Sequence, residues 1–376
     1  MYIKQAQLGS LDKNINKNKV LIVYGPRRCG KTTLLQKYLE SVSCKYLFIS
    51  GEDIIAREQL KTQSPEKLKG FLGDSSLLVI DEAQKIPEIG ANLKLIIDHI
   101  PGVHIIATGS SSFDLAQNIG EPLTGRKITL KLFPLAQMEI MRNENSVQTA
   151  ANLESRLIYG SYPEVVTSDD DKERVLYLRE LVNSYLLKDI LELDGIKHSA
   201  KIVRILQLLC FQIGREASLT EIGTQLGMSK NTVERYLDLL EKAFVIFRLG
   251  GFSRNLRKEI CKSSRFYFYD VGIRNALINN FNPLSIRDDV GMLWENYIIA
   301  ERMKKQEYEQ IFSNNYFWRT YDKKEIDFVE ERGGRLFGYE IKWGSGDVKV
   351  PKDWAQGYKN SEFECINREN YLKFIS

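Results

Sequence analysis

The chain has 376 residues, a length that suggests two or three domains rather than a single core. Its hydrophobic fraction of 43% and charged fraction of 27% are typical of a globular protein, and its formal charge of +4 permits a nucleic-acid partner without arguing for one. The five cysteines form no C-x-x-C pair and only three histidines occur, which excludes a disulfide framework and a zinc site. The sequence has no apolar run of about 18 residues and no secretory leader pattern, so we expect a cytoplasmic protein with no membrane contact.

The first third of the chain alternates short apolar segments with longer helical patterns. The apolar segments are residues 20–24, 45–49, 77–80, 104–108 and 128–132. Short apolar strands separated by helices are typical of a parallel sheet with helices on both faces. The pattern therefore predicts an α/β domain at the start of the chain.

A glycine-rich loop follows the first of these strands. The segment Gly25-Pro-Arg-Arg-Cys-Gly-Lys-Thr32 fits G-x-x-x-x-G-K-[ST] and precedes a helical pattern, which is the context of a phosphate-binding P-loop. Glycine lets the backbone wrap phosphates, Lys31 neutralises their β and γ oxygens, and the Thr32 hydroxyl ligates Mg²⁺. A chance glycine-rich turn is the alternative. The residues expected to bind the nucleotide here are Gly25, Pro26, Arg27, Arg28, Cys29, Gly30, Lys31, Thr32 and Thr33.

Two acids follow the third apolar segment. Asp81 comes directly after residues 77–80, so it is expected at the carboxyl edge of the sheet, where doubly wound sheets bind ligands. Asp81 can hold Mg²⁺ directly or through water, and Glu82 stands where a base for the attacking water belongs. This second signal favours hydrolysis of the nucleotide over binding alone.

The fourth apolar segment ends in the sequence Ala107-Thr-Gly-Ser-Ser-Ser112. Thr108 or Ser110 is a candidate sensor between the acidic pair and the γ-phosphate. A simple serine- and glycine-rich turn explains the same residues equally well.

The order of these motifs resembles the AAA+ branch of the additional-strand P-loop ATPases. In the segments Leu123-Thr-Gly-Arg126, Phe133-Pro-Leu135, Gly160-Ser-Tyr-Pro-Glu164 and Tyr185-Leu-Leu-Lys-Asp-Ile190, the chain resembles a large prokaryotic group of AAA+-like ATPases. The resemblance covers nearly the whole chain and implies ATP as the nucleotide, a helical and winged-helix middle, and a C-terminal nuclease-like fold. It also makes Arg126 a candidate arginine finger that would act on a neighbouring subunit of a homo-oligomer. A surface arginine is the alternative.

Residues 218–242 carry the signals of two helices joined by a short turn. Ser218 and Glu221 form a capping pattern, Gly227 ends the first helix, and Ser229 caps the second. Such a pair is a helix-turn-helix motif, which reads DNA from the start of its second helix. The residues expected to be exposed there are Lys230, Asn231, Thr232 and Arg235.

A basic stretch follows this motif and would suit a wing on double-stranded DNA. Its basic residues are Arg248, Arg254, Arg257, Lys258, Lys262 and Arg265. Glu234, Asp238 and Glu241 on the second helix would repel the phosphates. DNA binding and a purely structural packing role therefore both stay open.

The C-terminal region contains a hairpin pattern around Gly333-Gly334. Counting outward from this turn pairs Asp327 with Glu340 and Glu325 with Lys342 on one face. Two opposed carboxylates repel one another unless a cation lies between them, and Mg²⁺ is the candidate. The alternative is a solvated face with an ion pair between Glu325 and Lys342.

Asp327 followed by Glu340-Ile-Lys342 resembles the core of the PD-(D/E)XK nucleases. The resemblance implies that Asp327 and Glu340 bind a divalent metal ion and that Lys342 positions or activates water. Glu295 would be the helix acid that many members have. The candidate nuclease residues are therefore Glu295, Asp327, Glu340 and Lys342.

Together these patterns predict an AAA+-like P-loop domain (residues 1–150), a helical lid or linker (151–210), a winged helix-turn-helix (211–264) and a mixed α/β restriction-endonuclease-like domain (265–376). The favoured function is ATP hydrolysis coupled to a DNA-binding, metal-dependent nuclease module. One alternative is an ATP-dependent switch whose nuclease-like domain is an inactive interaction platform. Another is ATP-driven transport along DNA, which requires a ring or other oligomer.

Overall fold

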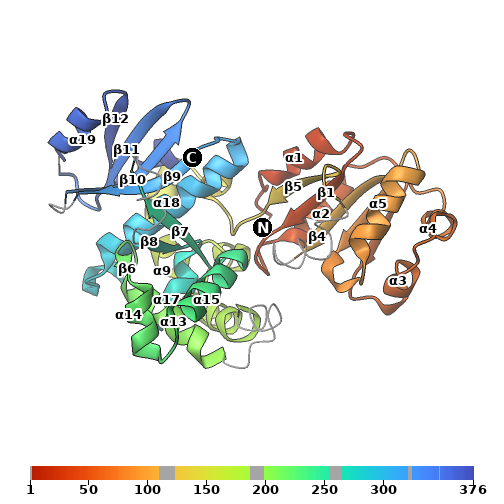
Figure 1. Cartoon of the computed structure of the whole chain (residues 1–376), viewed down its shortest axis with the longest axis horizontal. Helices are drawn as coiled ribbons and strands as arrows, with labels where there is room; N and C mark the ends of the chain where they lie inside the picture. Colours follow the sequence, from red (N-terminus) through yellow and green to blue (C-terminus); the bar gives the residue numbers. More distant parts are fainter. Residues whose placement is uncertain (1, 110–122, 187–198, 254–263, 321–323, 347) are drawn as a thin grey trace. The chain divides into compact units, whose positions relative to one another are not determined.

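The computed structural model describes residues 2–109, 123–186, 199–253, 264–320, 324–346 and 348–376 (Figure 1). These residues form two compact units. The N-terminal unit contains residues 2–134 and 242–244, and the C-terminal unit contains residues 135–241 and 245–376. In the part of the chain that the structure describes, no helix is both long and apolar enough to cross a lipid bilayer.

The N-terminal unit is built on a five-stranded parallel sheet. Its strands are β1 (Val20–Tyr24), β2 (Tyr46–Ser50), β3 (Leu77–Asp81), β4 (His104–Gly109) and β5 (Lys127–Lys131). Their order across the sheet is β2-β3-β4-β1-β5, so β4 is inserted between β1 and β3. The predicted parallel sheet is confirmed, and each strand begins within one residue of its apolar segment. The inserted strand agrees with the additional-strand arrangement that the resemblance implied.

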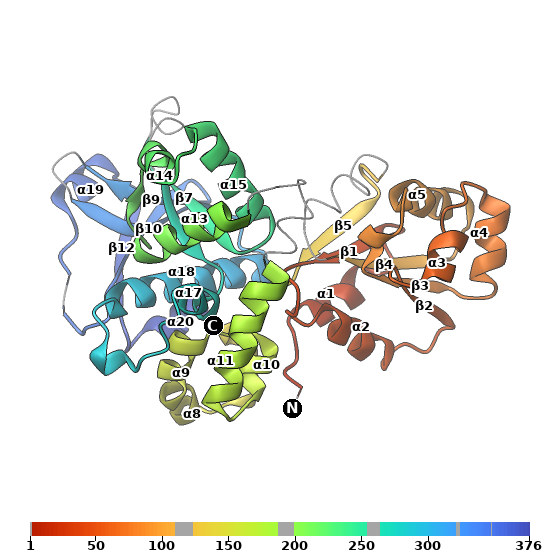
Figure 2. The ribbon, with the colours of Figure 1, turned by 90° about the horizontal axis from the view of Figure 1, so that it is seen from below.

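Helices cover both faces of this sheet, because its strands are apolar on both sides. They are α1 (Gln7–Asn14), α2 (Lys31–Leu39), α3 (Ile54–Gln59), α4 (Pro65–Leu72), η1 (Ala83–Lys85) and α5 (Ile89–His99). Helices α1 and α2 pack on one face through Leu11, Leu34 and Leu35, whereas α4 and α5 pack on the other through residues such as Leu68 and Leu93 (Figure 2). The two cores hold the carboxyl edge of β1, β3 and β4 in place.

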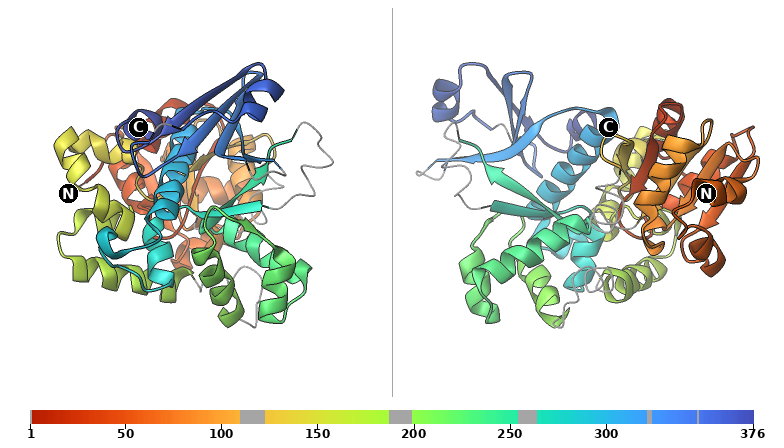
Figure 3. Two further views of the ribbon diagram at one scale, coloured as in Figure 1. Left: turned by 90° about the vertical axis from the view of Figure 1, so that its left-hand side faces the viewer. Right: turned by 45° about the vertical axis from the view of Figure 1, so that its right-hand side comes forward.

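The C-terminal unit contains most of the helices. They are α7 (Gln137–Ile140), η2 (Met141–Asn143), α8 (Ser146–Ala151), α9 (Leu153–Tyr159), α10 (Pro163–Thr167), α11 (Asp171–Glu180), η3 (Leu181–Leu186), α13 (Ser199–Phe211), α14 (Leu219–Leu226), α15 (Lys230–Lys242), α17 (Val271–Leu277), η4 (Leu284–Ile286), α18 (Val290–Glu309), α19 (Lys352–Gly357) and α20 (Tyr371–Ile375). The long helix α18 packs against β8, β11 and α20 (Figure 3).

A seven-stranded mixed sheet runs through this unit. Its strands are β6 (Glu216–Ala217), β7 (Ile246–Gly251), β8 (Ser264–Phe268), β9 (Asn314–Arg319), β10 (Glu325–Arg332), β11 (Arg335–Ile341) and β12 (Ser361–Ile366). The order is β12-β11-β10-β9-β7-β8-β6. The strands that follow α15 therefore continue directly into the sheet of the C-terminal hairpin, through the parallel pairing of β7 with β9.

Helices α14 and α15 have the capping that the sequence indicated. The Ser218 side chain accepts a hydrogen bond from the backbone N–H of Glu221, and Gly227 ends α14 in the left-handed conformation with φ 62°. The Ser229 hydroxyl accepts from the N–H of Thr232 at the start of α15. Val233 and Leu237 are buried, which leaves Lys230, Asn231 and Arg235 exposed and Thr232 half-buried.

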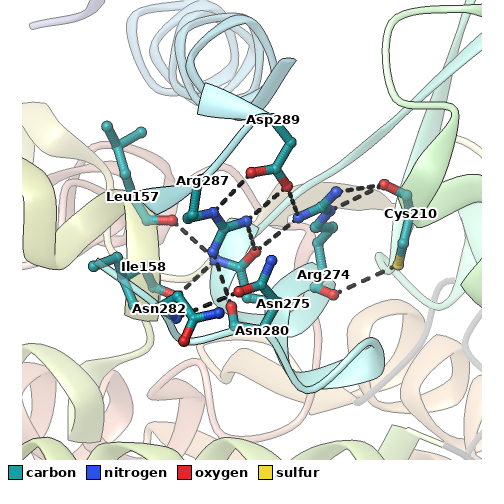
Figure 4. A network of polar contacts seen from close by, with 9 residues as sticks. All are labelled: Leu157, Ile158, Cys210, Arg274, Asn275, Asn280, Asn282, Arg287 and Asp289. Carbon is teal, nitrogen blue, oxygen red and sulfur yellow. Dashed lines mark hydrogen bonds and ion pairs between the residues drawn. The ribbon is translucent and has the colours of Figure 1, made fainter. Parts of the chain in front are cut away.

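A buried polar network fixes the start of α18 (Figure 4). Arg274 donates to the carbonyl oxygen of Cys210 and forms an ion pair with Asp289 at 2.6 Å. Arg287 also pairs with Asp289, at 2.7 Å, and Asn275 donates to the carbonyl oxygens of residues 157 and 158. These bonds tie α9, α13 and α17 to the residue that precedes α18, and so hold the helix that carries Glu295.

Candidate functional site

The glycine-rich loop occupies the turn between β1 and α2. A side chain at Gly25 would place its Cβ 1.8 Å from the carbonyl oxygen of Leu132, so only glycine fits at that position. Gly30 has φ 97° and Arg28 has φ 62°, both in the left-handed region. These two conformations turn the loop back on itself and lead it into α2.

The start of α2 offers positive potential to an anion. Gly30 is the N-cap of α2 and has no side chain to satisfy the first backbone N–H groups. The Lys31 ammonium is buried and donates to the carbonyl oxygens of Gly25 at 3.0 Å and Pro26 at 2.9 Å. The carbonyl oxygens of the loop thus hold the Lys31 ammonium. When a nucleotide binds, its phosphate oxygens could accept these hydrogen bonds in place of the carbonyls.

The acids after β3 meet this loop through two threonine hydroxyls. Thr32 Oγ1 donates to Asp81 Oδ2 at 2.6 Å, and Thr108 Oγ1 donates to Asp81 Oδ1. The same Thr108 oxygen accepts from the backbone N–H of Glu82 at 3.1 Å. The structure therefore brings Lys31, Thr32, Asp81, Glu82 and Thr108 together from β1–α2, β3 and β4.

This arrangement fits ATP with Mg²⁺. Gly25 lets the loop backbone pass close to the carbonyl oxygen of Leu132, and the N-terminus of α2, which no side chain caps, is suited to an anion. The Thr32 hydroxyl and the Asp81 carboxylate are adjacent oxygens of the kind that Mg²⁺ prefers.

The remaining predicted nucleotide residues occupy different environments. Cys29 is buried, whereas Arg28 and Thr33 are exposed. Arg126 forms a surface ion pair with Asp98 at 2.7 Å, and its side chain is 43% exposed. Ser110 lies outside the described residues.

Two glutamines at this site are not among the residues that the sequence predicted. Gln5 Nε2 donates to the carbonyl oxygen of Cys29 at 3.0 Å and lies against Gly30. Gln84 Nε2 donates to Glu82 Oε2. Gln84 could have been found from its place two residues after Glu82, whereas nothing in the sequence connects Gln5 with the loop.

A second set of charged residues lies in the C-terminal unit, and we name it the carboxylate cluster: Glu295, Glu325, Asp327 and Glu340. Strands β10 and β11 form the predicted hairpin in the predicted register, with Arg332 opposite Arg335 and Phe328 opposite Tyr339. Asp327 Oδ2 accepts from the backbone N–H of Ile341 at 2.9 Å, next to Glu340. The hairpin thus brings Asp327 and Glu340 together.

Cations of the protein itself accompany these acids. Arg265, only 3% exposed, lies 2.6 Å from Glu325 Oε2 and 3.7 Å from Asp327 Oδ1. Lys342 Nζ lies 2.6 Å from Glu340 Oε1. The alternative pairing of Lys342 with Glu325 is therefore wrong, because each has a nearer partner.

Two of the six basic residues proposed for the wing also have internal partners. Arg265 is buried in the carboxylate cluster, so the expectation that it lies on DNA phosphates is wrong. Arg248 pairs with Asp238 at 3.4 Å and with Glu241 at 3.5 Å. The other four basic residues lie outside the described residues.

Glu295 approaches the cluster from α18. The Tyr267 hydroxyl donates to its Oε1 at 2.7 Å, and a Cβ at Gly214 would lie 2.5 Å from that oxygen. Burial, followed by the charge of Asp327, raises the pKa of Glu295 to about 8. Burial also raises the pKa values of Asp327 and Glu340.

One buried carboxylate oxygen of the cluster stands out in the described part of the chain. Glu340 Oε2 is buried and has no hydrogen-bond partner among the described residues. Within those same residues, no three or more acids, histidines or cysteines are arranged as a metal-ligand group. Among the described residues, Glu295 therefore does not form a metal-ligand group with Asp327 and Glu340.

Comparisons with known families agree with the first of these two sites. Residues 17–141 match the family model described as an AAA domain. Residues 150–284 and 290–363 match two models that are each described as a domain of unknown function (DUF8612 and DUF4143). The N-terminal unit is thus an AAA-like P-loop ATPase domain.

Relatives extend along most of the chain. An uncharacterised protein of Mycobacterium tuberculosis is 25% identical over 88% of this chain and 72% of its own length. One from Methanocaldococcus jannaschii is 25% identical over 96% of this chain and 82% of its own length. The Walker-type ATPase of Pyrococcus abyssi, a solved structure, is 16% identical with a TM-score of 0.51, over 74% of this chain and 96% of that one. This last likeness is one of fold.

Proposed function

We propose that the chain hydrolyses ATP to ADP and phosphate at the P-loop. The observation that carries the proposal is the chain of contacts from Thr32 through Asp81 and Thr108 to Glu82. These contacts connect Thr32 and Asp81, which would bind the cation, with Glu82, which would activate water.

Each residue has a distinct part in the reaction. The N–H groups of the loop and Lys31 would hold the β- and γ-phosphates. Thr32 and Asp81 would hold Mg²⁺, which when bound would supply positive charge for the phosphate oxygens. Glu82 accepts a proton from the attacking water as the water oxygen bonds to the γ-phosphorus. The bond from that phosphorus to the β–γ bridging oxygen breaks, and ADP leaves with the electron pair.

Phosphate release from ATP in the presence of Mg²⁺ tests this proposal. Lys31→Ala removes the buried ammonium and should lower the rate by at least about 100-fold. Lys37→Ala is the matched control, because Lys37 lies on the same helix in a surface pair with Glu40. We expect Lys37→Ala to keep the wild-type rate. Equal rates for wild type and Lys31→Ala would place the hydrolysis elsewhere.

A metal-dependent nuclease is a second candidate function. It is favoured by the buried oxygen Glu340 Oε2, which lies next to Asp327 and has no hydrogen-bond partner among the described residues. The two carboxylates would hold a divalent ion and Lys342 would position water for attack on a phosphodiester. Double-stranded DNA is the candidate substrate, with Lys230, Asn231 and Arg235 of α15 exposed to meet it. ATP binding would control this module, within a homo-oligomer if Arg126 acts on a neighbouring subunit.

Cleavage of plasmid and linear DNA with Mg²⁺ or Mn²⁺, with and without ATP, tests this second candidate. Asp327→Asn should abolish cutting, and the control Asp353→Asn, in an exposed ion pair with Lys324, should not. The response to Lys31→Ala shows whether ATP controls cutting. Absence of cutting with intact ATP hydrolysis would favour the alternative, an ATP-dependent switch whose C-terminal unit is an interaction platform.

A further inference from the structure

Glu82 has an unusual backbone conformation for its residue type. Its φ of 53° lies in the left-handed region, which costs a non-glycine residue on the order of 1 kcal/mol. Gly51 makes this conformation possible, because a Cβ there would lie 2.2 Å from the carbonyl oxygen of Glu82. Gly51 also donates its N–H to the carbonyl oxygen of Asp81 at 2.7 Å.

The left-handed residue begins a tight turn that brings Gln84 back to Glu82. Residues Ala83–Lys85 form the short 3₁₀ helix η1, with the N–H of Lys85 bonded to the carbonyl oxygen of Glu82 at 3.0 Å. In this turn the Gln84 amide donates to Glu82 Oε2 at 2.5 Å. The backbone N–H of Glu82 is held independently by Thr108.

We propose that Gln84 is a positioning residue for ATP hydrolysis, and this inference rests on the proposed function. Its amide holds one carboxylate oxygen of Glu82, which leaves Oε1 to accept the proton of the attacking water. The strained turn, Gly51 and Thr108 fix the backbone of Glu82, and Gln84 fixes its side chain. Gln84 itself touches neither ATP nor water in this scheme.

Steady-state ATP hydrolysis by the full chain tests the inference with Gln84→Met, which keeps the length of the side chain and removes the donor. Misplacing a reacting group by about 1 Å costs on the order of 100-fold in rate, so we expect kcat to fall roughly 10- to 100-fold. KM for ATP should change less than about twofold, because Gln84 does not contact the nucleotide. Gln59→Met, at an exposed glutamine of the same unit, is the control and should leave both constants unchanged.

A double-mutant cycle separates positioning from a general structural role. In a Glu82→Gln background, Gln84→Met should have no further effect on kcat, because Gln84 acts only through the Glu82 carboxylate. Additive losses, an unchanged kcat in Gln84→Met, or a raised kcat would each overturn the inference.

The failure of the proposed function would look different. Wild-type protein would then release no phosphate from ATP, or Lys31→Ala would release as much as wild type. Either result would be seen in the assays of wild type and Lys31→Ala, without any measurement on Gln84→Met. A normal wild-type rate that is sensitive to Lys31→Ala, combined with no effect at Gln84, rejects the inference alone.

Discussion

The P-loop site and the carboxylate cluster both gather acidic side chains, but the negative charge is balanced differently in the two sites. At the P-loop, the oxygens of Asp81 accept hydrogen bonds from two threonine hydroxyls. In the carboxylate cluster, the side chains of Arg265 and Lys342 already supply positive charge. The P-loop site can therefore accept a cation from solution, whereas the carboxylate cluster already contains much of its own positive charge.

This difference favours ATP hydrolysis at the P-loop over metal-dependent DNA cleavage at the carboxylate cluster. A hydroxyl beside a carboxylate can exchange its hydrogen bond for a shared Mg²⁺ at little cost. A buried arginine between two acids must move, or share them, before a divalent ion can take its place. Among the described residues, the buried Glu340 Oε2 has no hydrogen-bond partner, and this is the part of the cluster that is suited to a metal ion.

Removing Arg265 should give the largest effect on stability. Arg265→Met leaves Asp327 and Glu325 without their partner, so we expect the free energy of unfolding to fall by about 3 kcal/mol. Arg335→Met, in an exposed pair with Glu362, should cost less than about 1 kcal/mol. Denaturant unfolding at pH 7 measures both. Equal losses would mean that Arg265 is not the counter-charge of the cluster.

The glycine-rich loop should be nearly as sensitive to one added methyl group. Gly25→Ala sets a Cβ against the carbonyl oxygen of Leu132, so we expect a loss of about 2 kcal/mol and at least a 10-fold weaker affinity for ATP. Gly70→Ala on α4 meets no atom within 4 Å and should be neutral or stabilising by about 0.5 kcal/mol. Unfolding curves and ATP titration check both variants. Unchanged ATP affinity in Gly25→Ala would show that the loop does not hold the phosphates.

The carboxylate cluster should also make the stability of the protein depend on pH. Because the pKa of Glu295 rises from 4.5 to about 8 on folding, the native state binds the extra proton between these values and loses stability as pH rises through them. Glu295→Gln keeps a neutral group that can accept from Tyr267. Its stability relative to wild type should therefore increase by roughly 3 kcal/mol between pH 6 and pH 9.

Urea unfolding in EDTA at the two pH values measures this change without a bound metal ion. Glu364→Gln, at an exposed acid of the same sheet, is the control and should show the same difference from wild type at both pH values. A constant difference for Glu295→Gln would mean that Glu295 is ionised throughout this range.

Arg126 should give the smallest effect on stability. Its ion pair with Asp98 is exposed, so Arg126→Ala should change the free energy of unfolding by less than about 0.5 kcal/mol. If Arg126 completes the site of a neighbouring subunit, the rate of ATP hydrolysis should fall while ATP affinity stays the same. Lys45→Ala, in another exposed pair, is the control for both assays. A wild-type rate in Arg126→Ala would leave the residue as a surface arginine.

The two sites also differ in how much of their geometry could be predicted from the sequence. The P-loop is contiguous, and the strand that carries Asp81 is a clean apolar run, so loop, strands and acids followed from local patterns. The register of the C-terminal hairpin also followed, because Gly333-Gly334 fixes the turn.

The rest depended on contacts between distant segments. Arg265 lies 60 residues before Glu325, its partner, and no local pattern distinguishes it from a surface arginine. The left-handed backbone conformation of Glu82, which lets the Gln84 side chain reach the Glu82 carboxylate, depends on Gly51, which follows another strand. The joining of β7 with β9 into one sheet is likewise a long-range pairing.

Glu82→Gln isolates the part that Glu82 plays as the residue activating water for ATP hydrolysis at the P-loop. The measurement is phosphate release under single-turnover conditions, together with ATP affinity, for wild type, Glu82→Gln and the surface control Glu40→Gln. We expect Glu82→Gln to bind ATP as wild type does but to release phosphate at least about 100-fold more slowly. A wild-type rate of phosphate release in Glu82→Gln would show that Glu82 does not activate the water.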